Sequence, residues 1–249
     1  MGGPSAAFMG FGPVSGDIAL QGSYDYAYRG PGGEPGPVGV YETFRVFQLH
    51  DGGAEILSER TAENGPFPGR LAVKAKCHAS VPDDRISRFQ VCWEPVRGRP
   101  RRASYRISAA SVHCSIDGGP EVASSLPPGA VALPLMRVFL GPAVLAVAER
   151  AGGEAAVLVP DIRDMESARL LHPLVDIRQA EADGTATSLA LPFGELPGQM
   201  YRFIGGSYSS KSRFWIDPRT KLLLRYEFPL SDGSCWTACI GSLQGSMGI

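Results

Sequence analysis

Apolar and polar residues alternate along most of this 249-residue chain, and no long stretch follows a helical period instead. The alternation is clearest at residues 24–28 (YDYAY), 42–46 (ETFRV), 88–91 (RFQV) and 212–216 (SRFWI). Because successive side chains of a strand point to opposite faces, each segment has one apolar and one polar face. This pattern is typical of an antiparallel sheet with one covered face.

Turn residues divide the chain into short predicted strands. Asp51-Gly52-Gly53 is a strong hairpin signal, because glycine and aspartate tolerate the positive φ angles of tight hairpin turns. We predict a short buried helix at 133–140 and one or two helical turns at 164–171, with Asp164 as the cap. The predicted strands are 17–29, 39–50, 54–62, 70–79, 85–96, 103–117 as one long or two short strands, 144–149, 155–160, 172–181, 186–191, 200–208, 211–217, 221–229 and 234–240.

So many strands with one apolar face must stack as two sheets or curl around a lumen, and a helix-like insert favours the curl. We therefore predict an all-β fold: a single antiparallel, strongly curved sheet or β-barrel that encloses a cavity, with one or two short helices. The 31 glycines and 21 prolines fit its many turns. The predicted domain is 17–243, with a loose lead at 1–16 and a tail at 244–249.

Charge and hydropathy exclude several classes of partner. With 24 basic and 25 acidic residues, the chain has no broad basic surface for nucleic acid. The apolar stretch 130–148 contains Arg137, Pro134 and Pro142, which argue against a membrane span. The first residues, MGGPSAAF, do not read as a secretory signal, so we expect a cytoplasmic protein with five reduced cysteines.

A row of polar residues provides candidates for acid/base chemistry. Lys74 and His78 share one face of a predicted strand, opposite an apolar row that includes Val73 and Cys77. If the polar row points into the lumen, a desolvated lysine and a histidine can exchange protons near neutral pH. If the apolar row faces the core instead, Lys74 and His78 are simply solvated.

Tyrosine and arginine rows complete the candidate site. We assign catalytic roles to Lys74, His78 and Tyr41, and substrate-binding roles to Tyr26, Arg45 and Arg213. Phenol and guanidinium groups that line a cavity orient an aromatic or oxygenated ligand by stacking and hydrogen bonding. The alternative is that these rows are ordinary packing and solvated cross-strand charges.

Metal and cofactor chemistry is not predicted. Cys77-His78 and His113-Cys114 offer four soft ligands, but adjacent strand residues point to opposite faces, so only one member of each pair can reach a shared ion. The chain has no phosphate-binding loop, dinucleotide fingerprint, nucleophile elbow or His-Glu-x-x-His motif. We therefore expect no metal and no cofactor.

The C-terminal strands carry a resemblance to a known family. Residues 214–218 (FWIDP) followed by 222–227 (LLLRYE) resemble the closing hairpin of curved-sheet lipid carriers of the LolA and LppX group. The resemblance covers a small part of the chain and implies hydrophobic cargo.

Two main functional hypotheses follow from the predicted container. The first is a cofactor-independent lyase, isomerase or cyclase that moves protons on a hydrophobic, aromatic or polycyclic small molecule held in the barrel. The alternative is a non-catalytic carrier or binding protein for a lipid or other hydrophobic ligand. A third, weaker hypothesis is an interaction module that uses exposed sheet edges, and the sequence leaves homo-oligomer formation open.

Overall fold

The computed structural model describes residues 11, 14, 16–63, 68–78 and 85–245. Its elements include one α-helix, α1 (Arg137–Ala148), and a short turn of 3-10 helix, η2 (Ala151–Gly153). The strands are β1 (Asp17–Arg29), β2 (Gly36–Gln48), β3 (Ala54–Ala62), β4 (Gly69–Cys77), β5 (Ile86–Pro95), β6 (Arg101–Ile107), β7 (Ser111–Ile116), β8 (Val122–Ser125), β9 (Val131–Ala132), β10 (Glu154–Pro160), β11 (Pro173–Ala182), β12 (Thr187–Leu191), β13 (Gly194–Ile204), β14 (Arg213–Ile216), β15 (Leu223–Pro229) and β16 (Cys235–Gly245).

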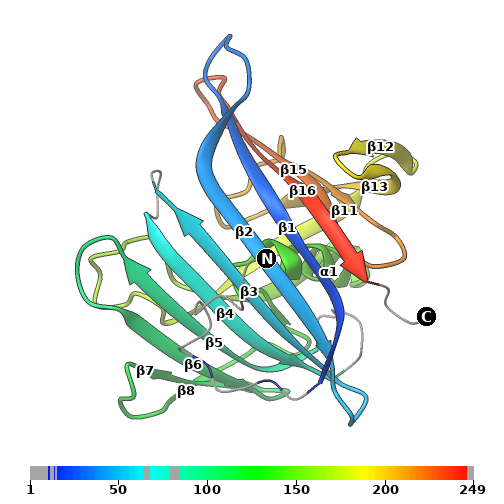
Figure 1. The fold of residues 1–249 in the computed structure, drawn as a ribbon. Coiled ribbons are helices and arrows are strands. Elements are labelled where there is room, and N and C mark those ends of the chain that lie inside the picture. Colours follow the sequence, from blue (N-terminus) through cyan, green and yellow to red (C-terminus); the bar gives the residue numbers. More distant parts are fainter. Residues whose placement is uncertain (1–10, 12–13, 15, 64–67, 79–84, 246–249) are drawn as a thin grey trace.

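The strands form one strongly curved sheet (Figure 1). Its order is β8-β7-β6-β5-β4-β3-β2-β1-β16-β15-β14-β13-β11-β10-β9, and β12 pairs with β13. Neighbouring strands are antiparallel except β9 and β10, which are parallel. Within the part of the chain that the structure describes, the end strands β8 and β9 do not pair, so the sheet curls without closing. The predicted all-β fold with a single strongly curved sheet is confirmed.

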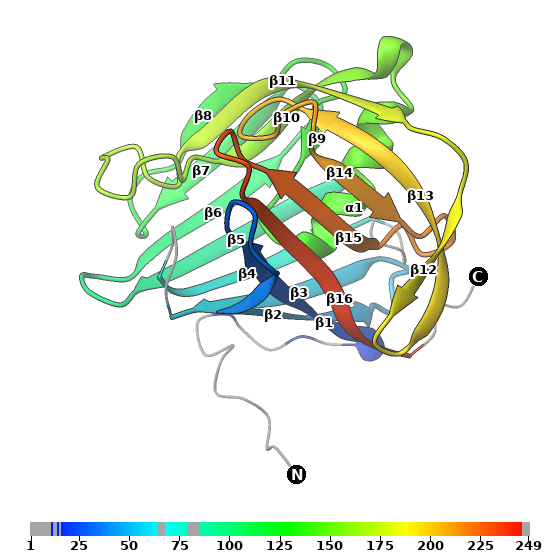
Figure 2. The ribbon, with the colours of Figure 1, turned by 90° about the horizontal axis from the view of Figure 1, so that it is seen from above.

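The concave face of the sheet encloses α1 (Figure 2). One row of residues in register across β2 to β6 shows which side is inner: Phe44, Ser58, Val73, Val91 and Ala103 are all buried. Removing each large apolar side chain from water stabilises the fold by roughly 1.5–3 kcal/mol. The period of two in the sequence therefore determines which side chains line the enclosed space.

The strand pattern was predicted well, but the apolar stretch around Arg137 was not. The predicted strand at 144–149 is wrong, because α1 continues to Ala148 and is buried on almost every side. The predicted helix at 133–140 begins too early, since Leu135 has a φ of 61°, outside the helical range. The segment 164–171 forms turns rather than a helix, and the Asp164 carboxylate accepts a hydrogen bond from the Glu166 N–H at 3.0 Å.

Helix α1 contains a proline and still forms. Pro142 follows Gly141, which has no Cβ to clash with the proline ring, so the usual obstacle to a helical residue before proline is reduced. The helix packs against β9, β10, β11 and β15. At 12 residues α1 falls well below a membrane-crossing length, and no helix among the described residues is long and apolar enough to cross a membrane.

Candidate functional site

A cavity of about 540 Å³ lies on the concave side of the sheet, beside the first turn of α1. It falls within the ~300–1,000 Å³ range of small-molecule sites. Exposed residues at its edge, among them Arg163 and Ser207, open it to solvent. Its walls are Arg60 of β3, the residues Leu133, Leu135, Met136, Arg137 and Leu140 in and before α1, Val159, Pro160, Ile162, Arg163, Leu174, Asp176 and Arg178 from β10 to β11, Gly206, Ser207 and Tyr208 after β13, and Tyr226 of β15.

Arg137 occupies the first position of α1 and brings a cation into the cavity wall. Its guanidinium carbon lies 4.8 Å from the ring centroid of Tyr226 and 5.6 Å from that of Tyr26. Its Nη1 donates a long hydrogen bond of 3.4 Å to the Tyr208 hydroxyl, and its buried Nε finds no acceptor among the described residues. Aromatic faces, rather than a carboxylate, are thus the main support of this cation.

Glu42 of β2 lies behind Arg137 and is only 1% exposed. Its carboxylate accepts hydrogen bonds from the Tyr26 hydroxyl at 2.8 Å, the Ser58 hydroxyl at 3.3 Å and the Arg137 backbone N–H at 2.7 Å. Burial raises the pKa of Glu42 above its ordinary value of 4.5, while Arg137 and the bond from Tyr26 act in the opposite direction. The side chain that caps α1 is therefore an acid whose charged form is penalised by burial.

The raised pKa of Glu42 predicts a pH dependence of stability. A group whose pKa is higher in the folded state stabilises the fold most below its unfolded pKa, and this contribution is lost as pH rises through the folded pKa. The quantity to compare is the stability advantage of the wild type, its free energy of unfolding minus that of Glu42→Gln. We expect this advantage to decrease as pH rises from about 4.5. Urea denaturation at a series of pH values measures it, and a difference independent of pH would contradict it.

Arg178 of β11 brings a second cation to the same cavity. It is 6% exposed and forms an ion pair with Asp176 at 3.1 Å. A turn after β13 lies directly on this pair: Gly206 has a φ of 60°, in the left-handed region, and a Cβ built on it would come within 2.7 Å of Arg178 Nη2. The Arg178 guanidinium carbon is 5.7 Å from the Tyr208 ring centroid, so Tyr208 contacts both Arg137 and Arg178.

Tyr208 is held in place by a cluster of aromatic rings. Its ring centroid lies 5.2 Å from that of Phe214 and 6.0 Å from those of Tyr226 and Phe228, all in edge-to-face geometry. Phe203 of β13 lies 5.7 Å away. Each such ring pair stabilises the fold by about 0.5–1.5 kcal/mol beyond the contribution of the area that it buries. The hydroxyl that meets Arg137 is thereby fixed by neighbours on β13, β14 and β15.

Two further voids continue from the cavity towards the loop ends of β5 and β6. A narrow one shares Arg60 and Ile162 with the cavity. It shares Trp93, Met165 and Leu170 with an outer groove of about 1210 Å³. That groove includes the basic residues Arg97, Arg99, Arg101 and Arg102.

The segment between β10 and β11 separates the cavity from this outer groove. Leu170 and Leu171 are almost completely buried, and the Tyr105 hydroxyl of β6 donates a hydrogen bond to the Leu171 carbonyl. At the other end of the segment, Asp161 pairs with Arg163 at 2.7 Å. The Leu171 end of the segment is thus anchored to β6, whereas the ion pair at the Asp161 end lies within the segment.

The structure places the predicted acid/base residues on the outer face of the sheet. Lys74 lies opposite the buried row and forms an ion pair with Glu55 at 3.3 Å. His78 is exposed just beyond β4, and Tyr41 is 48% exposed. The apolar row of β4 faces the core, so the lumenal position on which the predicted roles depended is not found. The catalytic roles themselves stay predictions.

The predicted ligand-binding residues lie in three different places. Arg45 shares a depression of about 380 Å³ on the outer face with Tyr41, and it lies on the same rung as Lys74, with Leu57 between them. Arg213 lies 4.0 Å from Asp183 and donates a hydrogen bond to the Ser210 carbonyl. Tyr26 alone points inward, where it donates to Glu42.

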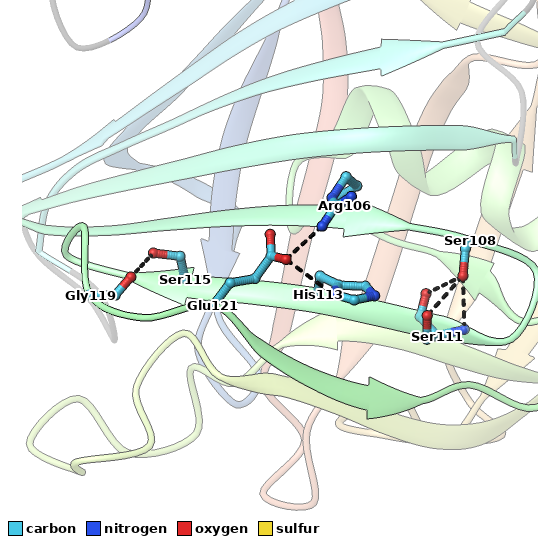
Figure 3. A network of polar contacts seen from close by, with 7 residues as sticks. All are labelled: Arg106, Ser108, Ser111, His113, Ser115, Gly119 and Glu121. Atoms are coloured by element: carbon cyan, nitrogen blue, oxygen red, sulfur yellow. Dashed lines mark hydrogen bonds and ion pairs between the residues drawn. The ribbon is translucent and has the colours of Figure 1, made fainter.

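His113, one of the two histidines considered as metal ligands, belongs to a network of polar contacts instead (Figure 3). His113 Nδ1 lies 3.0 Å from Glu121 Oε1, and that oxygen also accepts from Arg106 Nη2 at 2.5 Å. The neighbouring Cys114 is buried, and burial raises its pKa to about 11. Among the described residues, no group of three or more histidine, cysteine, aspartate or glutamate side chains is placed to hold a metal ion.

Sequence reasoning missed Glu42, Arg137, Arg178 and Tyr208 as site residues, although two signals were available. Glu42 stands at an apolar position of its strand, on the same face as Phe44 and Val46. Arg137 is the one charged residue in the apolar stretch 130–148. A charge in an otherwise apolar row needs a partner inside the fold, and here the two residues meet.

The chain forms a curved, β-barrel-like single sheet, and a known structure shares this fold. A β-barrel-like protein of domain of unknown function DUF1849 from Brucella abortus has a TM-score of 0.51 and 9% identity, over 93% of this chain and 99% of that chain. A putative outer membrane lipoprotein-sorting protein domain from Vibrio parahaemolyticus is also found, with a TM-score of 0.23 and 8% identity, over 92% of this chain and 86% of that chain.

These matches describe the fold alone, because their identities are so low. The resemblance to lipoprotein-sorting domains that the terminal hairpin indicated recurs in the second match, which is too distant to support an argument about function. No protein-family model and no curated protein sequence matches the chain.

Proposed function

We propose that this chain is a non-catalytic binding or carrier protein for a hydrophobic small molecule. The observation that carries the proposal is the cavity beside α1, whose wall combines aliphatic side chains such as Leu135, Leu140 and Leu174 with arginine and tyrosine side chains. Small-molecule sites have this composition, because apolar surface supplies affinity and a few polar groups fix orientation. The curved fold supports it, because the cavity lies on the concave side of the sheet and exposed residues at its edge open it to solvent.

Binding is favoured over catalysis by the chemistry of the cavity wall. The described residues that line it include no histidine, lysine or cysteine. Its carboxylate, Asp176, forms an ion pair with Arg178. Burial raises the pKa of the Tyr226 hydroxyl above its ordinary value of 10, further from neutrality. General acid/base catalysis needs a group that titrates near the working pH. A cofactor-independent lyase or isomerase therefore finds less support here than a carrier.

Filling the cavity tests the proposed function. A neutral fluorescent probe, N-phenylnaphthylamine, should bind the wild type saturably, and Leu174→Trp should weaken this binding at least about tenfold by occupying the cavity. Ile177→Trp is the matched control, because Ile177 belongs to the same strand but is 57% exposed. Unchanged binding by Leu174→Trp would overturn the proposal.

Mass spectrometry of the purified protein separates the two functions. Extraction of an organic compound that the protein releases unaltered supports a carrier. Turnover of that compound by the wild type, lost in Leu174→Trp, would replace the carrier by the enzyme. The measurement uses the full chain under native conditions.

A further inference from the structure

Arginine side chains gather in the wall of the cavity beside α1. Its lining includes the four arginines Arg60, Arg137, Arg163 and Arg178 and one carboxylate, that of Asp176. Asp176 forms an ion pair with Arg178, and Asp161 forms one with Arg163.

The guanidinium of Arg137 differs from those of Arg163 and Arg178, which pair with carboxylates. The carboxylate beside it, Glu42, is used by two hydroxyls and by the first N–H of α1. The Arg137 guanidinium forms no ion pair with a carboxylate of the described residues, and its Nε is buried without an acceptor. Arg137 is half-buried, and the buried part of a cation is costly to desolvate when no charged partner is present.

The surroundings of Arg137 suit the head of an amphiphile. Arg137 and Arg178 both contact Tyr208, so two guanidinium groups and a hydroxyl converge on one side of the cavity. Guanidinium groups bind carboxylate and phosphate oxygens through paired hydrogen bonds. Other residues of the same cavity, including Leu135, Leu140 and Leu174, offer hydrocarbon surface.

We propose that the cavity binds an amphiphile with an acidic head and a single hydrocarbon chain, whose anionic group contacts Arg137 and Arg178 beside Tyr208. This inference rests on the proposed function and narrows its ligand class. The anion is a carboxylate or a phosphate, as in a free fatty acid or a singly acylated phospholipid. Either one supplies the negative partner that the guanidinium of Arg137 lacks.

Calorimetric titration of the full chain with ten-carbon probes below their micellar concentrations tests the inference. Decanoate or decyl phosphate should bind at least about tenfold more tightly than decanol, which has the same chain and no charge. The tighter of the two anions indicates whether a carboxylate or a phosphate head is preferred. Equal affinity for decanol and both anions would overturn the inference and leave the proposed function standing, whereas binding of none of the probes would overturn both.

Two variants locate the anion. Arg137→Met should weaken decanoate binding at least about tenfold while leaving decanol binding unchanged. Arg219→Met is the matched control, because Arg219 is exposed in the turn between β14 and β15 and its loss should not change either affinity. Unchanged decanoate binding by a folded Arg137→Met would contradict the placement. The comparison of probes on the unmodified chain decides the inference even if Arg137→Met does not fold.

Discussion

Replacing Glu42 by alanine is expected to lower the free energy of unfolding by about 2–5 kcal/mol, because each buried donor left without an acceptor costs about 1–3 kcal/mol. Two buried donors lose their acceptor at once, the Tyr26 hydroxyl and the first N–H of α1, whereas the Ser58 hydroxyl keeps the Thr43 carbonyl as acceptor. Arg137 also loses the negative charge beside it. Urea denaturation followed by circular dichroism measures the loss.

A matched control and a rescue variant show whether the loss arises from the interior network. Glu195→Ala removes an exposed strand carboxylate that accepts one serine hydroxyl, and it should change stability by about 0.5 kcal/mol or less. The double variant Glu42→Leu with Arg137→Met replaces both charges by apolar groups and should recover at least half of the loss. A Glu42→Ala variant within about 1 kcal/mol of the wild type would contradict a structural role for this network.

The strands could be predicted because their signal is local. Alternation along β1 to β7 indicates which residues share a face, and the turn at Asp51-Gly52-Gly53 indicates that β2 and β3 pair. The predicted boundaries of β3 agree with the structure at both ends. The order of the whole sheet is a different matter, since β1 pairs with β16 across more than two hundred residues and no local pattern reports that contact.

The site could not be predicted in the same way, because it depends on which face is covered and on contacts distant in sequence. Parity placed Lys74 and Val73 on opposite faces but did not decide which one looks inward, and the structure puts Val73 in the core. The residues that meet at the cavity, Glu42, Arg137 and Arg178, come from β2, α1 and β11. Only the charges that Glu42 and Arg137 place in an apolar setting were visible in the sequence.

The position of α1 depends on close contact with the turn before β15. A Cβ built on Gly141 would lie 2.1 Å from the Lys221 carbonyl oxygen and 2.8 Å from the Leu223 backbone nitrogen. Both are backbone atoms, so a methyl group can be accommodated only if the helix or the turn moves. Because Arg137 lies one turn earlier in α1, such a movement also displaces the cation at the cavity.

Gly141→Ala is therefore expected to lower the free energy of unfolding by about 1–3 kcal/mol, the usual cost of overpacking a core. In an open helix the same substitution would stabilise by up to about 1 kcal/mol, so the sign of the change identifies the cause. Gly30→Ala is the matched control, since no atom lies within 4 Å of a Cβ at Gly30, and it should be nearly neutral. Urea denaturation of both variants gives the comparison, and a stabilised Gly141→Ala would show that α1 is not seated against residues 221–223.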